Sequence, residues 1–237
     1  MLSLSEVDPD VLKHLREALS KFVLPDNTTL LQASKDLYQL SQHPSFLSSL
    51  FFILANESAT EMRHTAAVVF RRKVVKLWKS IDDSNRLAIK EATLKRLQEE
   101  PDPVVRNSVM EMAGGIAKQE FAKKRPWEEV VKFVHSSVHS GNELEMERGT
   151  QVLKIICENA AGYLTEHHCG ILTLIDEVLK LSKTPNTWQY AVQAFNFLVP
   201  YLGDEEGKLV RALVPKSVLV IKSMLDNNME VMFLSFP

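Results

Sequence analysis

A group of basic side chains lies close together in the sequence, at Arg71, Arg72, Lys73, Lys76 and Lys79. Three of them, Arg72, Lys76 and Lys79, follow an i, i+4, i+7 spacing, which places them on one side of a helix. Guanidinium and ammonium groups held together in this way could bind an acidic partner through charge-assisted hydrogen bonds. A solvated helix face is the other interpretation of the same spacing, and the spacing alone leaves both open.

A second group, formed by His167, His168 and Cys169 together with Cys157, contains the residue types that bind zinc. Two adjacent histidines on a helix point about 100° apart, so they cannot both bind one ion. Cys157 is explained by packing on an apolar helix face. We therefore predict no metal centre and no cofactor.

Sequence motifs for catalysis are also lacking. The sequence contains no Gly-rich phosphate loop, no G-x-S-x-G, no H-E-x-x-H and no C-x-x-C. Its acidic stretches, at Asp82-Asp83, Glu143 to Glu147 and Asp204 to Glu206, fall at or near predicted helix starts, where the helix dipole favours negative charge. We therefore predict that the protein is not an enzyme.

The composition is that of an ordinary globular chain, with 45% hydrophobic residues, 24% charged residues and a formal charge of −2 over 237 residues. Near-neutral charge argues against a dedicated nucleic-acid binder. The two cysteines are too few for a disulfide framework and suit a reducing compartment. No run of about eighteen apolar residues predicts a membrane span, and residues 1–10 lack the pattern of a signal peptide. We expect a soluble intracellular protein.

The elements that must position these side chains are helices. Asp102 and Pro103 form a helix start, and Val105, Val109, Met112, Ala113 and Ile116 follow at helical spacing on one apolar face. Similar helix starts occur near Thr60, Asn142 and Pro185. Their spacing of roughly 42 residues is typical of HEAT repeats. The sequence therefore predicts an all-α superhelix, a HEAT-repeat or armadillo-like solenoid.

We count about eleven predicted helices, which form five full pairs and the first helix of a sixth. No linker divides them, so a single solenoid domain is expected over residues 1–237. Pro215 should kink or restart the last predicted helix. Residues 226–237 form an atypical, truncated tail, because they are apolar where a solenoid needs a polar cap. From this we expect that the chain is a fragment or an alternatively terminated product of something longer.

The order of residues from Met62 to Arg72, followed by Trp78, is more specific than the helix pattern. An arginine, two alanines, a basic pair and a tryptophan in this order resemble the second-repeat signature of the importin-β (karyopherin-β) family of nuclear transport receptors. Asp102 to Arg106 is similar to the family's third-repeat turn, and Pro126-Trp127 with Val130 to the opening of its fourth repeat. The resemblance, to the amino-terminal part of a receptor of the importin-four type, covers residues 9 to about 225.

This resemblance implies a module for nuclear import, found in the cytoplasm and the nucleus, including the nuclear pore and envelope. In the family, inner helices of the first repeats bind the GTP-bound form of the GTPase Ran. The residues on the matching helices here are Arg63, Arg71, Arg72, Trp78, Arg106 and Asn107. Arg63 and Arg106 also occupy a position where HEAT helices commonly place an arginine for bonds between repeats.

The resemblance implies further partners as well. These are basic cargo proteins, such as ribosomal proteins or histones, and Phe-Gly nucleoporins, which the rest of the solenoid would bind. We expect no direct contact with nucleic acid or with a membrane. Helix periodicity alone leaves a second hypothesis open, in which the chain is a HEAT-repeat scaffold or a regulatory subunit of a multiprotein assembly without a GTP-dependent partner.

Overall fold

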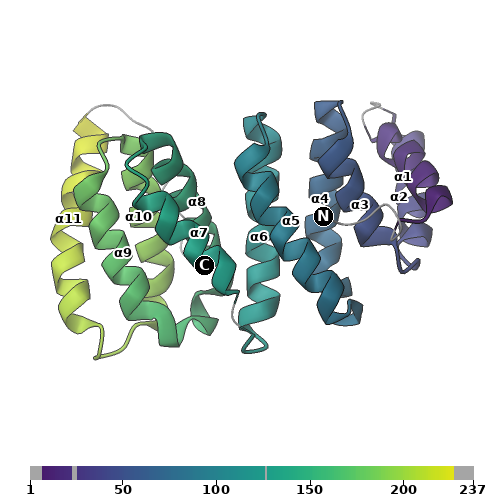
Figure 1. Cartoon of the computed structure of the whole chain (residues 1–237). Helices are drawn as coiled ribbons and strands as arrows, with labels where there is room; N and C mark the ends of the chain where they lie inside the picture. The colour runs from purple at the N-terminus through teal and green to yellow at the C-terminus, as the bar shows by residue number, and fades with distance from the viewer. Residues whose placement is uncertain (1–6, 23–25, 126, 227–237) are drawn as a thin grey trace. The chain divides into compact units, whose positions relative to one another are not determined.

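The computed structural model describes residues 7–22, 26–125 and 127–226, and this part of the chain is helical and contains no strand (Figure 1). The α-helices of the described residues are α1 (Pro9–Lys21), α2 (Asn27–Leu40), α3 (Phe46–Asn56), α4 (Thr60–Leu77), α5 (Asp83–Glu99), α6 (Pro103–Phe121), α7 (Glu128–Val138), α8 (Glu143–Ala160), α9 (His168–Leu181), α10 (Pro185–Leu198) and α11 (Gly207–Asp226). The predicted number and order of helices are confirmed. None of these helices combines the length and the apolar character that crossing a membrane requires.

Short polar side chains begin several helices, as the sequence predicts. Each accepts hydrogen bonds from backbone N–H groups two or three residues later, and these residues are Asp8, Asp26, Asp82, Asp102 and Asn142. A cap of this kind stabilises a helix by about 1 kcal/mol. Beyond the end of α7, Gly141 has a φ of 73°, a left-handed conformation that glycine adopts readily. Local chemistry therefore fixes where these helices begin and end.

Contacts along the chain cluster in two compact units, Met1–Gln119 (unit 1) and Glu120–Pro237 (unit 2). In unit 1, α1 packs on α2 and α3, and α3 packs on α4. In unit 2, α7 packs on α8, α9 packs on α10, α8 packs on α10, and α11 packs on α9 and α10. A single domain over residues 1–237 stays a prediction. The tail expected at 226–237 lies outside the described residues except for Asp226.

A repeated hydrogen bond joins the two helices of a pair. In the second, third and fifth pairs, a side chain in the first turn of the second helix donates to a backbone carbonyl six residues earlier, at the end of the first helix. The bonds are Arg63 to Glu57 (3.2 Å), Arg106 to Glu100 (2.8 Å) and Trp188 to Ser182 (3.0 Å). Because the last carbonyls of a helix have no partner within it, these donors satisfy groups that would otherwise lack one.

Polar contacts also join successive pairs, and their sequence separation equals about one repeat. Arg16 pairs with Glu57, 41 residues later, and Arg63 pairs with Glu100, 37 residues later. In unit 2, the Glu143 carboxylate accepts from the backbone N–H of Lys183, 40 residues later. These separations agree with the spacing of roughly 42 residues seen in the sequence, and they confirm that the chain repeats one structural unit.

The contact between α7 and α8 depends on Gly149. A Cβ atom built on Gly149 would lie 2.4 Å from the Ser137 Cβ and 3.4 Å from the Val134 carbonyl oxygen. Gly149→Ala should therefore push the two helices apart and lower the free energy of unfolding by about 1 to 2 kcal/mol, although alanine favours a helix.

The matched control is Gly170→Ala in α9, where a Cβ would meet no atom within 4 Å. This control should raise the free energy of unfolding by about 0.5 to 1 kcal/mol. Urea denaturation measures both values, and equal stability of the two variants would contradict the close approach of α7 and α8.

Pro215 does not interrupt the last helix, because α11 runs from Gly207 to Asp226 as one element. The expected restart of the helix is therefore wrong, and the kink, which was the other expectation, stays a prediction. Pro215 and Arg211, whose carbonyl loses its helical hydrogen bond, both lie on the exposed side of α11. Water can satisfy that carbonyl there, so the helix continues.

Candidate functional site

Arg63, the first residue of the signature, is buried rather than presented to a partner. Its guanidinium group holds the Glu100 carboxylate with two hydrogen bonds, Nε to Oε2 at 3.2 Å and Nη2 to Oε1 at 3.0 Å. The Glu100 side chain is fully buried, and Arg96 also donates to it. Burial alone would raise the pKa of the Glu100 carboxyl, but the bonds from Arg63, Arg96 and the backbone N–H of Asp102 hold this pKa below its ordinary value of 4.5. Arg63 therefore joins the second and third pairs.

Trp78 and Arg106 are also engaged within unit 1. Trp78 lies in a 3-10 turn, Trp78–Ser80, after α4, and only 1% of its surface is exposed. Arg106 donates to the carbonyl oxygens of Glu100 and Pro101, at 2.8 and 2.9 Å from Nη2. Of the six residues predicted to bind a partner, Arg63 and Trp78 are buried, Arg106 holds backbone carbonyls, and Arg71, Arg72 and Asn107 are exposed.

The basic group on α4 and on the 3-10 turn that follows it divides into two parts. Lys73 is half-buried, lies 5.8 Å from the centre of the Tyr38 ring on α2, and donates to the Ser41 hydroxyl. Arg71 pairs with Glu111 on α6 at 3.4 Å, and both side chains are partly exposed. These two residues connect α4 to the second helices of the neighbouring pairs. Their contacts place α2, α4 and α6 side by side within unit 1.

The other part, Arg72, Lys76 and Lys79, is the cationic row. All three side chains are exposed. Within the described ranges, no hydrogen bond or ion pair to any of them is found. Arg72 and Lys76 lie on α4, whereas Lys79 lies in the 3-10 turn that follows it, and all three positive charges are open to solvent. Such a row attracts an acidic surface and speeds association with it.

Exposed apolar side chains lie on α2, α4 and α6. They are Leu31 and Tyr38 on α2, Val75 on α4 and Val104 on α6, with 45% to 66% of their surface exposed. Interfaces commonly combine such groups with positive charge. They were not predicted from the sequence, although Leu31 and Tyr38 are spaced seven residues apart, which places them on one side of their helix.

The histidines considered for metal binding lie in different environments. His168 is buried, with Nε2 3.2 Å from the Ala161 carbonyl oxygen, whereas His167 is exposed and its ring meets the Phe121 ring edge-on. Burial raises the pKa of the Cys157 thiol to about 12. Among the described residues, no three histidine, cysteine or acidic side chains are grouped to hold a metal ion.

Known protein families match most of the sequence. Residues 33–102 match the family described as Importin-beta N-terminal domain, and residues 101–235 match the family described as IPO5-like, TPR repeats. The chain is 25% identical to Importin-4 of Mus musculus over 211 residues, which cover 89% of the chain and 19% of that protein. It is 26% identical to the Probable importin subunit beta-4 of Schizosaccharomyces pombe over 153 residues, 64% of the chain and 14% of that protein.

Solved structures of Kap121p share the fold. The chain aligns with Kap121p at a TM-score of 0.75 and 20% identity, covering 94% of the chain and 21% of Kap121p. Kap121p bound to RanGTP aligns at a TM-score of 0.74, covering 93% of the chain and 20% of that protein. The predicted all-α superhelix is confirmed. The chain spans about a fifth of the length of these relatives.

Proposed function

Because the chain belongs to the importin-β family, we propose that it is a module of a nuclear import receptor that binds the GTP-bound form of Ran through unit 1. The observation that carries this proposal is the cationic row, Arg72, Lys76 and Lys79, which is exposed and unpaired within the described part of the chain. Kap121p, which has the same fold, has been solved in complex with RanGTP.

In this proposal the six residues that the resemblance implies have two different roles. The cationic row, Arg71 and Asn107 contact the GTPase, together with the exposed apolar residues of α2, α4 and α6. Arg63, Arg106 and Trp78 do not touch it and instead hold the helices that carry the contacts. This division assigns direct contact only to exposed side chains. It therefore requires no rearrangement of buried groups when the partner binds.

The proposal extends to cargo and location. We infer that the parent receptor carries basic cargo, such as ribosomal proteins or histones, contacts Phe-Gly nucleoporins, and moves between cytoplasm and nucleus through the nuclear pore. Solved complexes of Kap121p with Nup53p, Ste12p, Ulp1p and Pho4p support a transport role of this general kind. They do not include ribosomal proteins or histones.

Substitution of the arginine pair tests the proposed surface. Arg71→Ala/Arg72→Ala should weaken the affinity for Ran·GTP about 10-fold or more, because two charged contacts are lost. The loss should become smaller at high salt, which screens exposed charges. Isothermal titration at low and high salt measures both effects.

The matched control is Lys13→Ala/Lys208→Ala, which removes the same charge from exposed positions on α1 and α11. This control should bind Ran·GTP with the affinity of the unmodified chain. Equal affinities of the arginine variant and the control would show that the α4 surface is not the binding site.

A further inference from the structure

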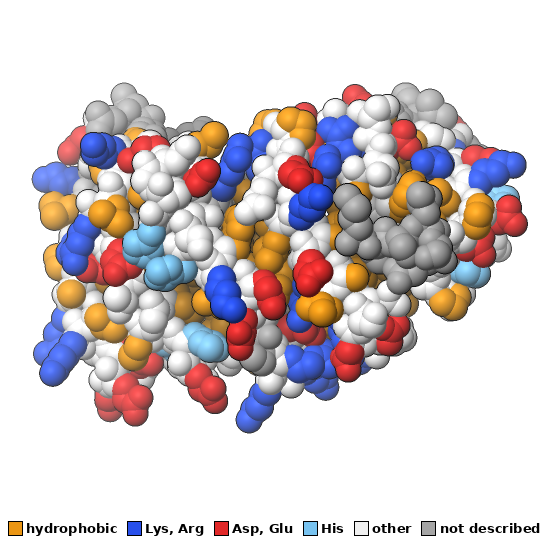
Figure 2. Space-filling model, viewed as in Figure 1, with side chains coloured by type: hydrophobic (Ala, Val, Ile, Leu, Met, Phe, Trp, Pro, Cys, Tyr) orange, Lys and Arg blue, Asp and Glu red, His pale blue; other side chains and the backbone are white. Residues whose placement is uncertain are grey.

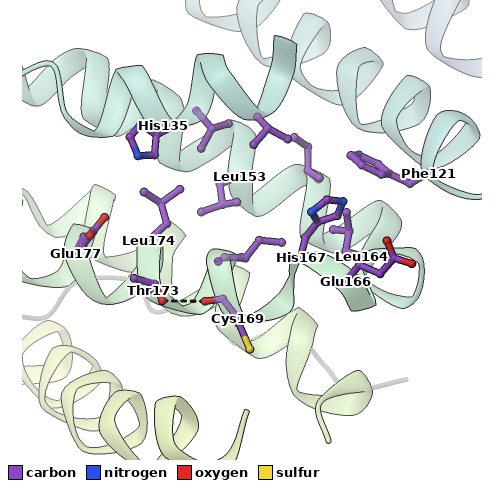
Figure 3. A pocket seen from close by; sticks show the side chains of 15 residues that line it. Phe121, His135, Leu153, Leu164, Glu166, His167, Cys169, Thr173, Leu174 and Glu177 are labelled. Atoms are coloured by element: carbon purple, nitrogen blue, oxygen red, sulfur yellow. Dashed lines mark hydrogen bonds between the residues drawn. The ribbon is translucent and has the colours of Figure 1, made fainter. Parts of the chain in front are cut away.

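Two histidines lie one helical turn apart at the end of α7, beside an acidic residue of α9. The rings of His135 and His139 stack, with their centres 4.3 Å apart, and the Glu177 Oε2 lies 3.2 Å from the His139 Nε2. Figure 2 shows histidine side chains close together on this face of unit 2. Figure 3 shows His135 and Glu177 at the same end of a cavity of about 570 Å³. Two imidazoles and a carboxylate, which are all zinc donors, are thus neighbours at a surface open to solvent.

The His139 ring has the orientation that metal-binding histidines commonly adopt. Its Nδ1 lies 2.8 Å from the His135 carbonyl oxygen. Because a carbonyl can only accept a hydrogen bond, Nδ1 carries the hydrogen and donates it, which leaves a lone pair on Nε2 of the neutral ring. Histidines that bind a metal through one nitrogen usually donate the other N–H to a carbonyl or a carboxylate. The free Nε2 therefore lies next to the Glu177 carboxylate.

A lone pair and a carboxylate oxygen at 3.2 Å repel each other unless a cation lies between them. Two donor atoms that bind one tetrahedral zinc ion, at about 2.0 to 2.2 Å each, are about 3.3 Å apart. No lysine or arginine occurs among the described residues that line the cavity, and none pairs with Glu177 in the described ranges. The cation is therefore either a proton on Nε2 or a metal ion.

We propose that His135, His139 and Glu177 bind a zinc ion on the surface of unit 2. The His139 Nε2 and the Glu177 Oε2 are in place, although the described side chains do not form a complete set of three ligands. His135 is exposed, so its ring can turn to become the third ligand, and water supplies the fourth.

The zinc ion would connect α7 to α9, which are the first helices of successive pairs. A zinc site here was not expected from the sequence, in which only His167, His168 and the two cysteines were considered. The site is also independent of Ran binding, which we assign to unit 1.

Isothermal titration of the full, metal-free chain with ZnCl₂ at neutral pH tests the proposal. We expect saturable binding of one zinc ion per chain. MgCl₂ at the same concentrations should not bind, because magnesium prefers six oxygen ligands to imidazole nitrogen. If zinc does not bind in this way, the cation beside Glu177 is a proton and the proposal is wrong.

Single substitutions test the position of the site. His139→Gln, Glu177→Gln and His135→Gln each remove one donor at a position that is at least partly exposed, so the chain should still fold. Each should lower the affinity for zinc about 10-fold or more.

The matched controls are His14→Gln on α1 and Cys169→Ser on α9, which remove an exposed imidazole and an exposed thiol elsewhere. Both should bind zinc with the affinity of the unmodified chain. Unchanged affinity of His139→Gln or Glu177→Gln, or weaker binding by either control, would place the zinc at another site and contradict the proposal. Unchanged affinity of His135→Gln would contradict its role as the third ligand.

Thermal denaturation provides a readout that is specific to the folded site. Zinc at ten times its dissociation constant should raise the Tm of the unmodified chain by about 3 to 5 °C, because the ligands are held together only in the folded chain. The Tm of His139→Gln should change far less at the same zinc concentration. An equal rise in both proteins would overturn the assignment.

Discussion

Arg63→Met is expected to lower the free energy of unfolding by about 3 kcal/mol at neutral pH. Methionine retains much of the buried volume but leaves the Glu100 carboxylate, which is fully buried, without two of its hydrogen bonds. The expected loss is at the low end for a broken buried ion pair because Arg96 still holds Glu100. Urea denaturation of both proteins measures the difference.

The same variant has a predicted pH dependence. The pKa of Glu100 in the folded chain lies below its ordinary value of 4.5. The ion pair therefore contributes its full stability above this value and loses it as the pH falls through the lower, folded-state pKa. The difference between Arg63→Met and the unmodified chain should accordingly shrink on acidification.

A matched control for Arg63→Met is Arg16→Met. Arg16 makes the corresponding contact one repeat earlier, with Glu57 at 3.1 Å, but its side chain is 42% exposed. An exposed ion pair contributes at most about 1 kcal/mol, so this control should change stability far less. Equal losses in the two variants would contradict a special role for the buried pair. The affinity of folded Arg63→Met for Ran·GTP should stay unchanged.

Trp78→Ala should cost about 3 to 5 kcal/mol of unfolding free energy, because it removes a large, fully buried side chain and leaves a cavity. Val75→Ala is the control on the neighbouring turn of α4. Val75 is 45% exposed, and its replacement should change stability by no more than about 0.5 kcal/mol. Thermal and urea denaturation measure both. If Trp78→Ala lowers the free energy of unfolding only slightly and the folded variant no longer binds Ran·GTP, Trp78 contacts the partner and the assignment to the core is wrong.

Helix positions could be predicted because their signals are local. Asp102 and Pro103 identify the start of α6, and the predicted apolar face, Val105, Val109, Met112, Ala113 and Ile116, is buried throughout. Pro215 shows the limit of local rules. Its effect depends on whether the carbonyl that it frees faces water, and the sequence alone does not determine this.

The roles of the signature residues could not be separated in the same way. Arg63 and Arg72 are both arginines on α4, and only the third pair, which supplies Glu100, distinguishes the buried side chain from the exposed one. The exposure of apolar residues such as Leu31 depends on which neighbouring helices cover them, and the sequence of one helix does not show this. Burial by a neighbouring repeat is a tertiary property, and 37 residues separate Arg63 from the carboxylate that it binds.

The most direct test of the account is the affinity of the unmodified chain for Ran loaded with a GTP analogue or with GDP, measured by isothermal titration at physiological salt. The account predicts saturable binding of the GTP form and at least about 10-fold weaker binding of the GDP form, a difference of about 1.4 kcal/mol. Equal binding of both forms, or binding of neither by a chain shown to be folded by circular dichroism, would contradict it and would favour a HEAT-repeat scaffold without a GTP-dependent partner.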